Sequence, residues 1–512
     1  MKTRKIGRCR TFGGSLLLHR CRPCRDRKAK ITVAVTAIGI AGVLPACGSL
    51  PQTQETQAFR PPPSHPVQAP ALPGAQPISA NDRVYTADQD SNTVTVINPK
   101  TDTVLGTIAL GKPRLDTNAD VLGAMYDGQI DVHGLGFSRD GRYLDVIDVT
   151  SNAVHVIDTA TNQVLHTIYL DRAPHEGFFS PDGNELWVAE RGVDTVAVID
   201  WRHGRVIARI HSENGPSKVV FSPDGRLAYV NHLRASSFDV IDVATRRIIQ
   251  HVAIPSVAGG SSDEAISPDG KEIWLGMPAN GYSTTVVNAQ TYKVEAVLNS
   301  GPRTNHPNFV TVNGVNYAYL TVGDLGETLV YRRSDTGGPP TLVKRIRDHG
   351  LGPHGIWPSP DNTRVYVALQ YSDAVDVIDT RSMKVIDTMR IGQSPMALVY
   401  VARSSPGTTT ANLGRQGLGM RIENRPIEVQ GASGTGDAQI RALPGIDEVT
   451  VDVRGLPANQ RFTVYLTRGS QTTALLSATT DNMGNMEEAV AFLDFFANHY
   501  DKVIVRLGAA SS

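Results

Sequence analysis

Hydrophobic and polar residues alternate along much of this chain, in short runs that are bounded by turn residues. The segment Asp194–Asp200 shows the pattern well, because apolar and polar positions follow one another as in a strand with two faces. Most runs end in Val-Ile-Asp or a close variant. The six copies are Val96-Ile97-Asn98, Val156-Ile157-Asp158, Val198-Ile199-Asp200, Val240-Ile241-Asp242, Val286-Val287-Asn288 and Val377-Ile378-Asp379.

A second phrase, Ser-Pro-Asp-Gly, recurs between these runs with a spacing of 42 residues from Ser138 to Ser180 to Ser222. Proline presets φ for the first turn position and glycine accepts positive φ, so each copy predicts a tight turn. A repeat of this length, made of short strands and turns, is typical of a propeller blade. The copies and weaker versions start at Ser138, Ser180, Ser222, Ser267, Thr311 and Ser359.

Each repeat divides into four strands. In the third repeat they are predicted at 177–180, 185–190, 195–200 and 205–210. A degenerate run at Thr328-Leu329-Val330 raises the number of repeats to seven.

The two ends of the repeat region predict how the ring closes. The first repeat opens at Asp82-Arg83-Val84-Tyr85 without an inner strand, and the last is followed by an orphan inner strand, 395–400. We therefore expect an all-β fold, a seven-bladed β-propeller in which the C-terminal strand completes blade one and removes the free edges.

The two phrases, together with Ala228-Tyr229-Val230-Asn231 and Val365-Tyr366-Val367-Ala368, resemble the YVTN-type β-propeller repeat family. The resemblance covers residues 82–403 and implies the fold. It implies no single activity, because similar propellers serve as surface proteins, as lactonases, and as carriers of amine dehydrogenase or haem d1 chemistry.

Composition divides the chain into five parts. Residues 1–46 hold eleven Lys/Arg and one acid, followed within that stretch by an apolar run, which predicts an export signal. Residues 47–80 are rich in proline and predict a disordered tether. The propeller is expected over 81–403, a linker over 404–418, and a small β-rich, sandwich-like domain over 419–512.

The signal ends in Leu44-Pro45-Ala46-Cys47, which resembles the lipobox of bacterial lipoproteins. That resemblance implies lipidation of Cys47 and an anchor in the cell envelope, with the outer membrane as partner. The other three cysteines lie in the leader, so the mature chain has no disulfide, no cysteine-ligated metal and no covalent c-type haem. From Cys47 onward there are 39 basic and 49 acidic residues, which argues against nucleic-acid binding.

The C-terminal region has fewer signals. Residues 448–453 and 461–466, with Gly455-Leu456-Pro457 between them, predict a hairpin, and 502–507 predicts a further strand. The stretch 487–496 has the composition of a helix.

One aligned column of the propeller carries candidate chemistry. The residue five positions before each turn serine opens the inner strand, and inner strands line the central channel. Across the blades this column contains His133, His175, Ser217, Ser262, His306, His354 and, from the closing strand, Met396.

Three interpretations of this column stay open. Imidazole and thioether groups that converge on an axis suit copper or an axially ligated haem, and zinc also accepts histidine. In this case the protein is a metal carrier or oxidoreductase, with Glu176, Asp263 and Asn305 orienting the ligands. Alternatively the column forms a metal-free channel mouth that binds a small ligand or a protein partner, or the histidines are inherited by duplication.

We expect a binding protein rather than an enzyme. A lactonase needs carboxylates that converge with histidine, and the column supplies histidine and serine; no Gly-x-Ser-x-Gly elbow occurs either. The segment Asp88-x-Asp90-x-Asn92 lacks the glycine and distal glutamate of a calcium loop and predicts an exposed turn. Glu190, Arg191 and His232 follow second strands, where residues either rim the channel or lie on plain surface, and we expect plain surface.

Overall fold

The computed structural model describes residues 76–111, 130–254, 260–278, 282–404 and 409–508. The leader, Cys47 and nearly all of the proline-rich stretch therefore lie outside the described residues. The described residues all fall within one compact unit. No helix within the described ranges is long and apolar enough to cross a membrane.

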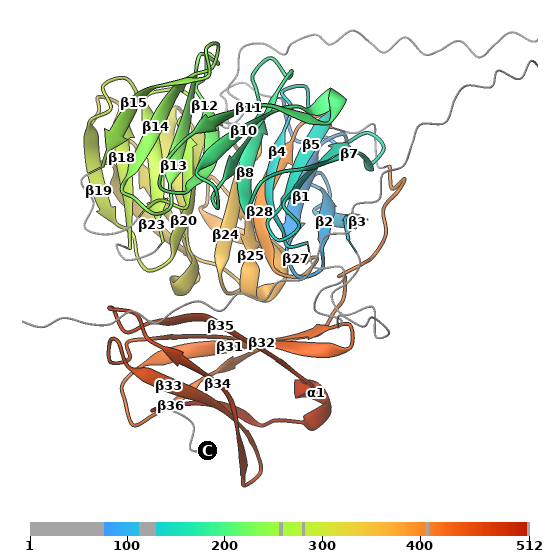
Figure 1. The fold of residues 1–512 in the computed structure, drawn as a ribbon, viewed down its shortest axis with the longest axis vertical. Coiled ribbons are helices and arrows are strands. Elements are labelled where there is room, and N and C mark those ends of the chain that lie inside the picture. Colours follow the sequence, from blue (N-terminus) through green and yellow to red (C-terminus); the bar gives the residue numbers. More distant parts are fainter. Residues whose placement is uncertain (1–75, 112–129, 255–259, 279–281, 405–408, 509–512) are drawn as a thin grey trace, which may run out of the picture. The chain divides into compact units, whose positions relative to one another are not determined.

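Seven four-stranded antiparallel sheets form the β-propeller (Figure 1). Blade one consists of β28 (Pro395–Val401), β1 (Arg83–Asp88), β2 (Thr93–Asn98) and β3 (Thr103–Ala109) in that order. The predicted closure by the C-terminal strand is thereby confirmed, with Tyr85 paired to Val399 and Val84 to Tyr400.

The other six blades follow one another along the chain, and each runs from its inner to its outer strand. Blade two contains β4 (Val132–Phe137), β5 (Tyr143–Asp148), β6 (Ala153–Asp158) and β7 (Gln163–Tyr169). Blade three contains β8 (Pro174–Phe179), β9 (Leu186–Glu190), β10 (Thr195–Asp200) and β11 (Arg205–His211). Blade four contains β12 (Pro216–Phe221), β13 (Leu227–His232), β14 (Ser237–Asp242) and β15 (Arg247–Ala253). Blade five contains β16 (Asp263–Ile266), β17 (Glu272–Met277), β18 (Ser283–Asn288) and β19 (Val294–Asn299). Blade six contains β20 (Thr304–Val312), β21 (Val315–Val322), β22 (Glu327–Arg332) and β23 (Thr341–Arg347). Blade seven contains β24 (Pro353–Pro358), β25 (Arg364–Leu369), β26 (Ala374–Asp379) and β27 (Lys384–Arg390).

The Ser-Pro-Asp-Gly phrase builds the turn between the first two strands of a blade. In blade three, the Ser180 hydroxyl donates to Asp182 (2.6 Å) and accepts from the Glu185 amide (2.9 Å). The Gly183 amide donates to the Ser180 carbonyl, and Gly183 has a φ of 72°, a conformation that favours glycine. The same serine-to-aspartate bond forms at Ser138, Ser222, Ser267 and Ser359, so the phrase builds the same local turn in five blades.

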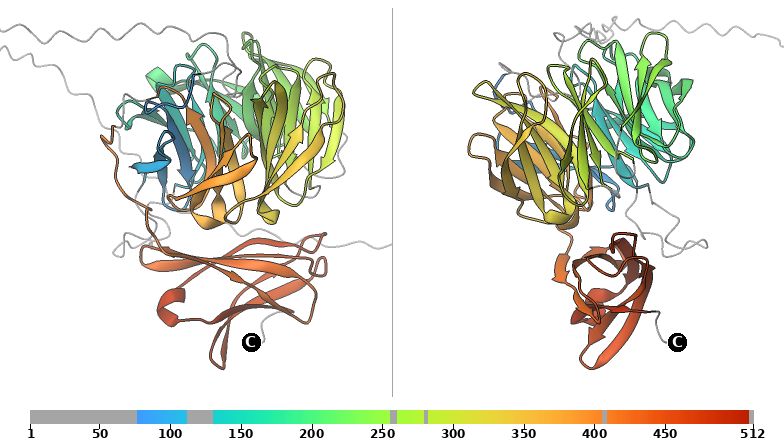
Figure 2. Two further views of the ribbon diagram at one scale, coloured as in Figure 1. Left: turned by 180° about the vertical axis from the view of Figure 1, so that it is seen from behind. Right: turned by 90° about the vertical axis from the view of Figure 1, so that its left-hand side faces the viewer.

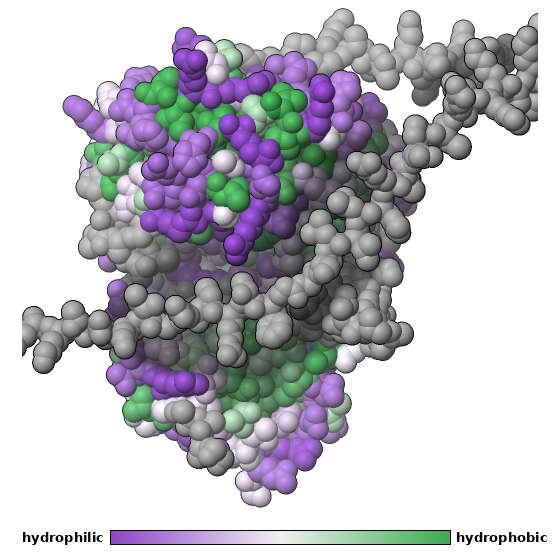
Figure 3. All heavy atoms as spheres, viewed as in Figure 1, coloured by the Kyte–Doolittle hydropathy of each residue, from purple (hydrophilic) through white to green (hydrophobic). Residues whose placement is uncertain are grey.

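The core lies between neighbouring blades. Inner and middle strands are buried almost throughout, and Trp187 and Trp274 are among the largest fully buried side chains. The outermost strands are much more exposed, and in β11 exposed residues alternate with partly buried ones. On the face drawn in Figure 3, hydrophobic and hydrophilic side chains are interspersed over the propeller.

The C-terminal domain is a β-sandwich of two four-stranded sheets (Figure 2). One sheet contains β29 (Ile422–Pro426), β31 (Thr435–Leu443), β32 (Ile446–Arg454) and β35 (Met486–Leu493). The other contains β30 (Glu428–Gln430), β36 (Lys502–Leu507), β33 (Arg461–Arg468) and β34 (Gln471–Thr479). Alternate residues of the two sheets, such as Val451 and Val464, meet in one apolar core.

Two local expectations about this domain are wrong. The strands β32 and β33 do not pair as a hairpin, because Leu456 is buried in the sandwich core and the chain crosses there from one sheet to the other. The stretch expected as a helix forms β35, and only α1 (Phe495–Asn498) is helical. Six residues of β35 pair with β32, and this tertiary pairing overrides local helix propensity.

The segment Asp88–Asn92 is a turn between β1 and β2, but it is buried rather than exposed. Asp88 accepts hydrogen bonds from Thr86 (2.7 Å) and Thr95 (2.6 Å), and burial raises its pKa to about 7. Asp90 pairs with Arg441 of the sandwich. Both carboxylates are therefore engaged in contacts within the protein.

Candidate ligand site in the central channel

The aligned column opens the inner strands in the structure as well. His133, His175, Ser217, His354 and Met396 are each the second residue of an inner strand. His306 is the third residue of β20, and Ser262 directly precedes β16. All seven residues therefore lie at the same end of the inner strands.

Four imidazoles form a continuous arc. The ring centroids of His175 and His133 lie 4.3 Å apart, those of His133 and His354 6.3 Å, and those of His354 and His306 4.6 Å. Met396 belongs to the blade between those of His354 and His133, and its carbonyl accepts a hydrogen bond from His354 Nδ1 (3.1 Å). The structure thus brings the four histidines together and places the Met396 backbone among them.

Hydrogen bonds to carbonyls determine which nitrogen of two rings carries the proton. His175 Nδ1 lies 2.9 Å from the Ser217 carbonyl, and His354 Nδ1 is bonded to the Met396 carbonyl. Because a carbonyl only accepts, both Nδ1 atoms must be protonated, and Nε2 is then the nitrogen with the lone pair. His306 Nδ1 lies 2.9 Å from Asp263 Oδ2, a carboxylate that also pairs with Lys218.

Burial keeps the imidazoles of His133, His175 and His306 neutral. It lowers the pKa of His306 to about 3 and lowers the pKa values of His133 and His175 well below the usual range. Neighbouring cations and imidazoles add to the effect on His133 and His175. A neutral imidazole is the form that binds metals or accepts hydrogen bonds.

Arg191 occupies the serine side of the ring, and its expected place on plain surface is wrong. It follows β9, and its guanidinium donates to the hydroxyls of Ser217 (Nε, 3.2 Å) and Ser262 (Nη2, 3.1 Å). Burial lowers the pKa of Arg191 to about 9. Glu190 and His232 are also buried, the latter between Ser212, Ser237 and Asp239.

A charged layer lies one residue further along the inner strands. The Lys218 ammonium bridges Glu176 (3.0 Å) and Asp263 (2.9 Å), and all three side chains are buried. Burial alone lowers the pKa of an ammonium, but the two carboxylates raise the pKa of Lys218 above its usual value. Burial raises the pKa of Glu176 and of Asp263, and Lys218 counteracts both shifts.

A cavity of about 20 Å³ lies beneath the arc on the propeller axis, since residues from all seven inner strands line it. Leu135, Ile356 and Leu398 are among its apolar lining residues. This volume holds about one water molecule. Buried polar atoms near the arc, among them His133 Nδ1 and Asn305 Oδ1, have no hydrogen-bond partner within the described part of the chain, which points to water or an ion at this layer.

Two groups of side chains could hold a metal ion among the described residues. In each, the ligand atoms lie within 4.8 Å of one another: His133, His175 and Glu176 in one, and Glu176, Asp263 and His306 in the other. The Lys218 ammonium already occupies the second group as a tethered cation. The first group is therefore the candidate metal centre.

Column alignment finds residues that recur from blade to blade, and it found the histidines. It cannot find Arg191 or Lys218, because each belongs to one blade only. The equivalents of Lys218 in the neighbouring blades are Glu176 and Asp263. The signal that the sequence did offer for Lys218 is that this lysine stands between two acidic residues, Glu176 and Asp263, at equivalent positions of neighbouring blades.

One glycine-rich sequence, Gly350-x-Gly352-x-x-Gly355, has the spacing of a dinucleotide-binding loop. It leads into strand β24 and not into a helix, so it lacks the structural context of such a site.

Neither a protein-family model nor a curated protein sequence matches this chain. Membership of the YVTN-type family therefore stays a resemblance. Solved structures with a similar fold include a functionally unknown protein from Desulfotomaculum acetoxidans, with 13% identity and a TM-score of 0.51 over 62% of this chain and 98% of that one.

Two further similar structures carry a named activity. The periplasmic gluconolactonase of Pseudomonas aeruginosa has 18% identity and a TM-score of 0.49, covering 63% of this chain and 99% of its own. The hydrazine synthase of Kuenenia stuttgartiensis has 18% identity and a TM-score of 0.47, covering 52% of this chain and 89% of its own. At these identities the likeness concerns the fold alone.

Proposed function

We propose that this protein is an exported binding protein whose ligand site is the histidine arc at one end of the propeller channel. The ligand is a single transition-metal ion. The observation that carries this proposal is that His133, His175 and Glu176 place their ligand atoms within 4.8 Å of one another, while the Ser217 carbonyl holds Nδ1–H of His175 and leaves its Nε2 as the lone-pair nitrogen. Metal-binding histidines are oriented in this way, by a carbonyl or carboxylate on the other nitrogen.

The donor set selects the class of ion. Two imidazoles and one carboxylate, from His133, His175 and Glu176, suit zinc or copper better than magnesium or calcium, which prefer oxygen ligands. A haem is disfavoured within the channel, because the cavity beneath the arc has room for about one water molecule.

Binding is favoured over hydrolysis. His306 and Asp263 form a pair that resembles a histidine base with its orienting carboxylate. However, a base with a pKa of about 3 removes protons poorly at neutral pH, where catalytic bases work best with a pKa near the ambient pH. The pair is better suited to orienting a ligand nitrogen than to activating water on a lactone.

The place of action follows from the leader. Export, lipidation of Cys47 and a proline-rich tether of about thirty residues would hold the propeller off the outer membrane, within about 90 Å if extended. In this setting the protein would take up or carry metal in the cell envelope.

The test is metal stoichiometry on the exported full chain, purified without a histidine tag. We expect one zinc or copper ion per chain by elemental analysis and titration calorimetry. The double variant His133→Asn/His175→Asn should lose the ion while it keeps its circular dichroism spectrum. A matched control, His203→Asn/His211→Asn, changes two exposed histidines and should bind normally. A metal-free chain that takes up neither ion, or unchanged binding by the first variant, would overturn the proposal.

A further inference from the structure

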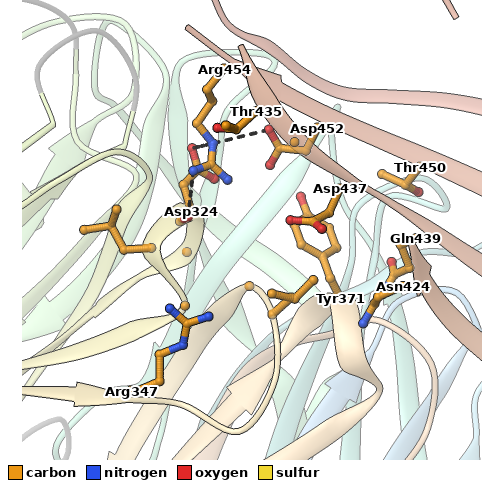
Figure 4. Close-up of a pocket in the computed structure, with 16 residues that line it drawn as sticks. Asp324, Arg347, Tyr371, Asn424, Thr435, Asp437, Gln439, Thr450, Asp452 and Arg454 are labelled. Atoms are coloured by element: carbon orange, nitrogen blue, oxygen red, sulfur yellow. Dashed lines mark hydrogen bonds and ion pairs between the residues drawn. The ribbon is translucent and has the colours of Figure 1, made fainter. Parts of the chain in front are cut away.

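A second cavity, of about 340 Å³, lies where loops of blades six and seven meet the sandwich sheet (Figure 4). Its volume falls within the range of about 300–1,000 Å³ that is usual for pockets that hold small organic molecules. The propeller lines it with Leu325, Leu351 and Tyr371, among others, and the sandwich with Asn424, Asp437 and Gln439. Gly352, another lining residue, is two positions from His354, so the cavity lies at the histidine end of the propeller.

The alternation of β31 and β32 explains why the sandwich wall is polar. Thr435, Asp437 and Gln439 share one face of β31, while Ala438 and Ile440 point into the sandwich core. On β32, Thr450, Asp452 and Arg454 share the corresponding face. The register pairs Asp437 with Asp452 and Gln439 with Thr450, so two rows of polar side chains meet across the strands.

Three charged residues of the lining are engaged with one another. Arg454 Nε lies 3.0 Å from Asp324 and 3.7 Å from Asp452. Arg303, just outside the lining, approaches the same two carboxylates at 3.5 Å each. These two arginines and two aspartates balance in charge, as do Asp437 and Arg347 of the lining, so the cavity is suited to a neutral ligand.

Two polar side chains of the sandwich wall have hydrogen-bonding groups that no other described residue uses. The carboxyl of Asp437 makes no hydrogen bond or ion pair with another described residue, and burial raises its pKa. Gln439 is 4% exposed, and its Nε2 has no hydrogen-bond partner among the described residues, although its Oε1 accepts from Arg441 (3.0 Å). A buried donor without a partner costs free energy, and a ligand that accepts from it removes that cost.

The two walls therefore differ in chemistry. The propeller contributes apolar side chains and an aromatic ring, and the sandwich contributes an acceptor, Asp437, beside a donor, Gln439. In Figure 4 both side chains extend from the sandwich strands toward the side on which Tyr371 lies. A ligand with an apolar face and an edge of hydroxyl groups matches this arrangement, because each hydroxyl both donates and accepts.

We propose that this cavity binds a neutral sugar, with its hydroxyl edge on Asp437 and Gln439 and its C–H face on Leu325, Leu351 and Tyr371. This site is separate from the metal site, and neither depends on the other. The sandwich is then half of a ligand site, which gives it a role beyond covering the propeller.

The experiment is calorimetric titration of the exported full chain with glucose, galactose, N-acetylglucosamine and cellobiose, supported by saturation-transfer NMR. We expect saturable binding of at least one sugar with a Kd of about 1 mM or tighter. Asp437→Ala and Gln439→Ala should each weaken it by at least about tenfold, because each removes a hydrogen bond to the ligand. Glu428→Gln, an exposed change on the same domain, should leave it unchanged.

Two results would overturn the proposal. One is the absence of saturable binding for all four sugars in a chain with an unchanged circular dichroism spectrum. The other is binding that survives in both the Asp437 and the Gln439 variants, or binding of the zwitterion glycylglycine in place of the sugars. Titrating His133→Asn/His175→Asn with the same sugars separates the two sites, since this variant should lose metal and keep sugar.

Discussion

Replacing Lys218 with methionine should destabilise the propeller and turn its charged layer into a metal site. The Lys218 ammonium lies 2.9 Å from Asp263 and 3.0 Å from Glu176. At an effective dielectric constant of about 20, a pair of unit charges at about 3 Å attracts by about 5–6 kcal/mol. Much of this attraction is offset by desolvation of the ammonium, but its removal leaves two buried carboxylates without compensation. We expect a net loss of about 3–5 kcal/mol.

The same variant should gain affinity for a divalent cation. Glu176, Asp263 and His306 place their ligand atoms within 4.8 Å of one another, and in the variant no ammonium lies between them. Manganese suits such an oxygen-rich site. At a manganese concentration of about 100 times Kd, binding to the native state alone restores about 2.7 kcal/mol.

The loss should also depend on pH. Burial raises the pKa of Glu176 and of Asp263, and Lys218 opposes this, so both pKa values rise further in the variant. Between the unfolded and the raised folded pKa values the native state binds more protons than the unfolded state, and stability therefore falls as pH rises. The Lys218→Met variant should be closer to the parent protein near pH 5 than near pH 8.

Urea unfolding followed by tryptophan fluorescence measures all three effects. The four tryptophans, residues 187, 201, 274 and 357, all belong to the propeller, so the signal reports on that domain. Lys384→Met, an exposed change on β27, is the matched control. Parent-like stability of Lys218→Met in EDTA, or a manganese effect no larger than in the parent protein, would refute the reasoning.

Three further predictions concern other parts of the molecule. Arg441→Met should lower the free energy of unfolding in urea by about 3–5 kcal/mol, because buried Arg441 pairs with Asp90, Asp373 and Glu448. Arg421→Met removes an exposed ion pair and should lower it by less than about 1 kcal/mol. Equal losses would contradict the interpretation of Arg441 as a buried link between propeller and sandwich. Arg191→Met should tighten zinc binding by about tenfold or more in calorimetry, since it removes a cation beside the histidine arc; weaker binding would mean that Arg191 holds an anionic ligand. Val399→Asp should abolish cooperative unfolding of the propeller at neutral pH, because Val399 is 1% exposed in the closing strand and the change buries a carboxylate there. A variant with parent-like stability would argue against the ring closure.

The candidate site was only partly accessible from the sequence. Aligned repeats placed His133, His175, His306 and His354 at equivalent positions, and equivalent positions of a closed ring converge. The pairing of Lys218 with Glu176 and Asp263 links three different blades. Such a contact depends on how neighbouring blades pack and leaves no repeated signal in the chain.

The pocket at the sandwich shows a similar limit. The alternation of β31 marks Asp437 and Gln439 as one face of a strand, but the face lies opposite Leu351 and Tyr371, which are more than sixty residues earlier in the chain. The hairpin expected between β32 and β33 was wrong for the same kind of reason, because burial of Leu456 in the sandwich core outweighs the local turn signal.

The sequence by itself determined the repeat, the number of blades and the closure of the ring, because strand alternation and turn chemistry act over a few residues and recur in each blade. Only the tertiary structure decided the tautomers of the histidines, the partners of Lys218 and Arg191, and the lining of the second cavity. These depend on the low-dielectric interior and on contacts between residues far apart in the chain, where the distance between charges and their removal from water determine the chemistry.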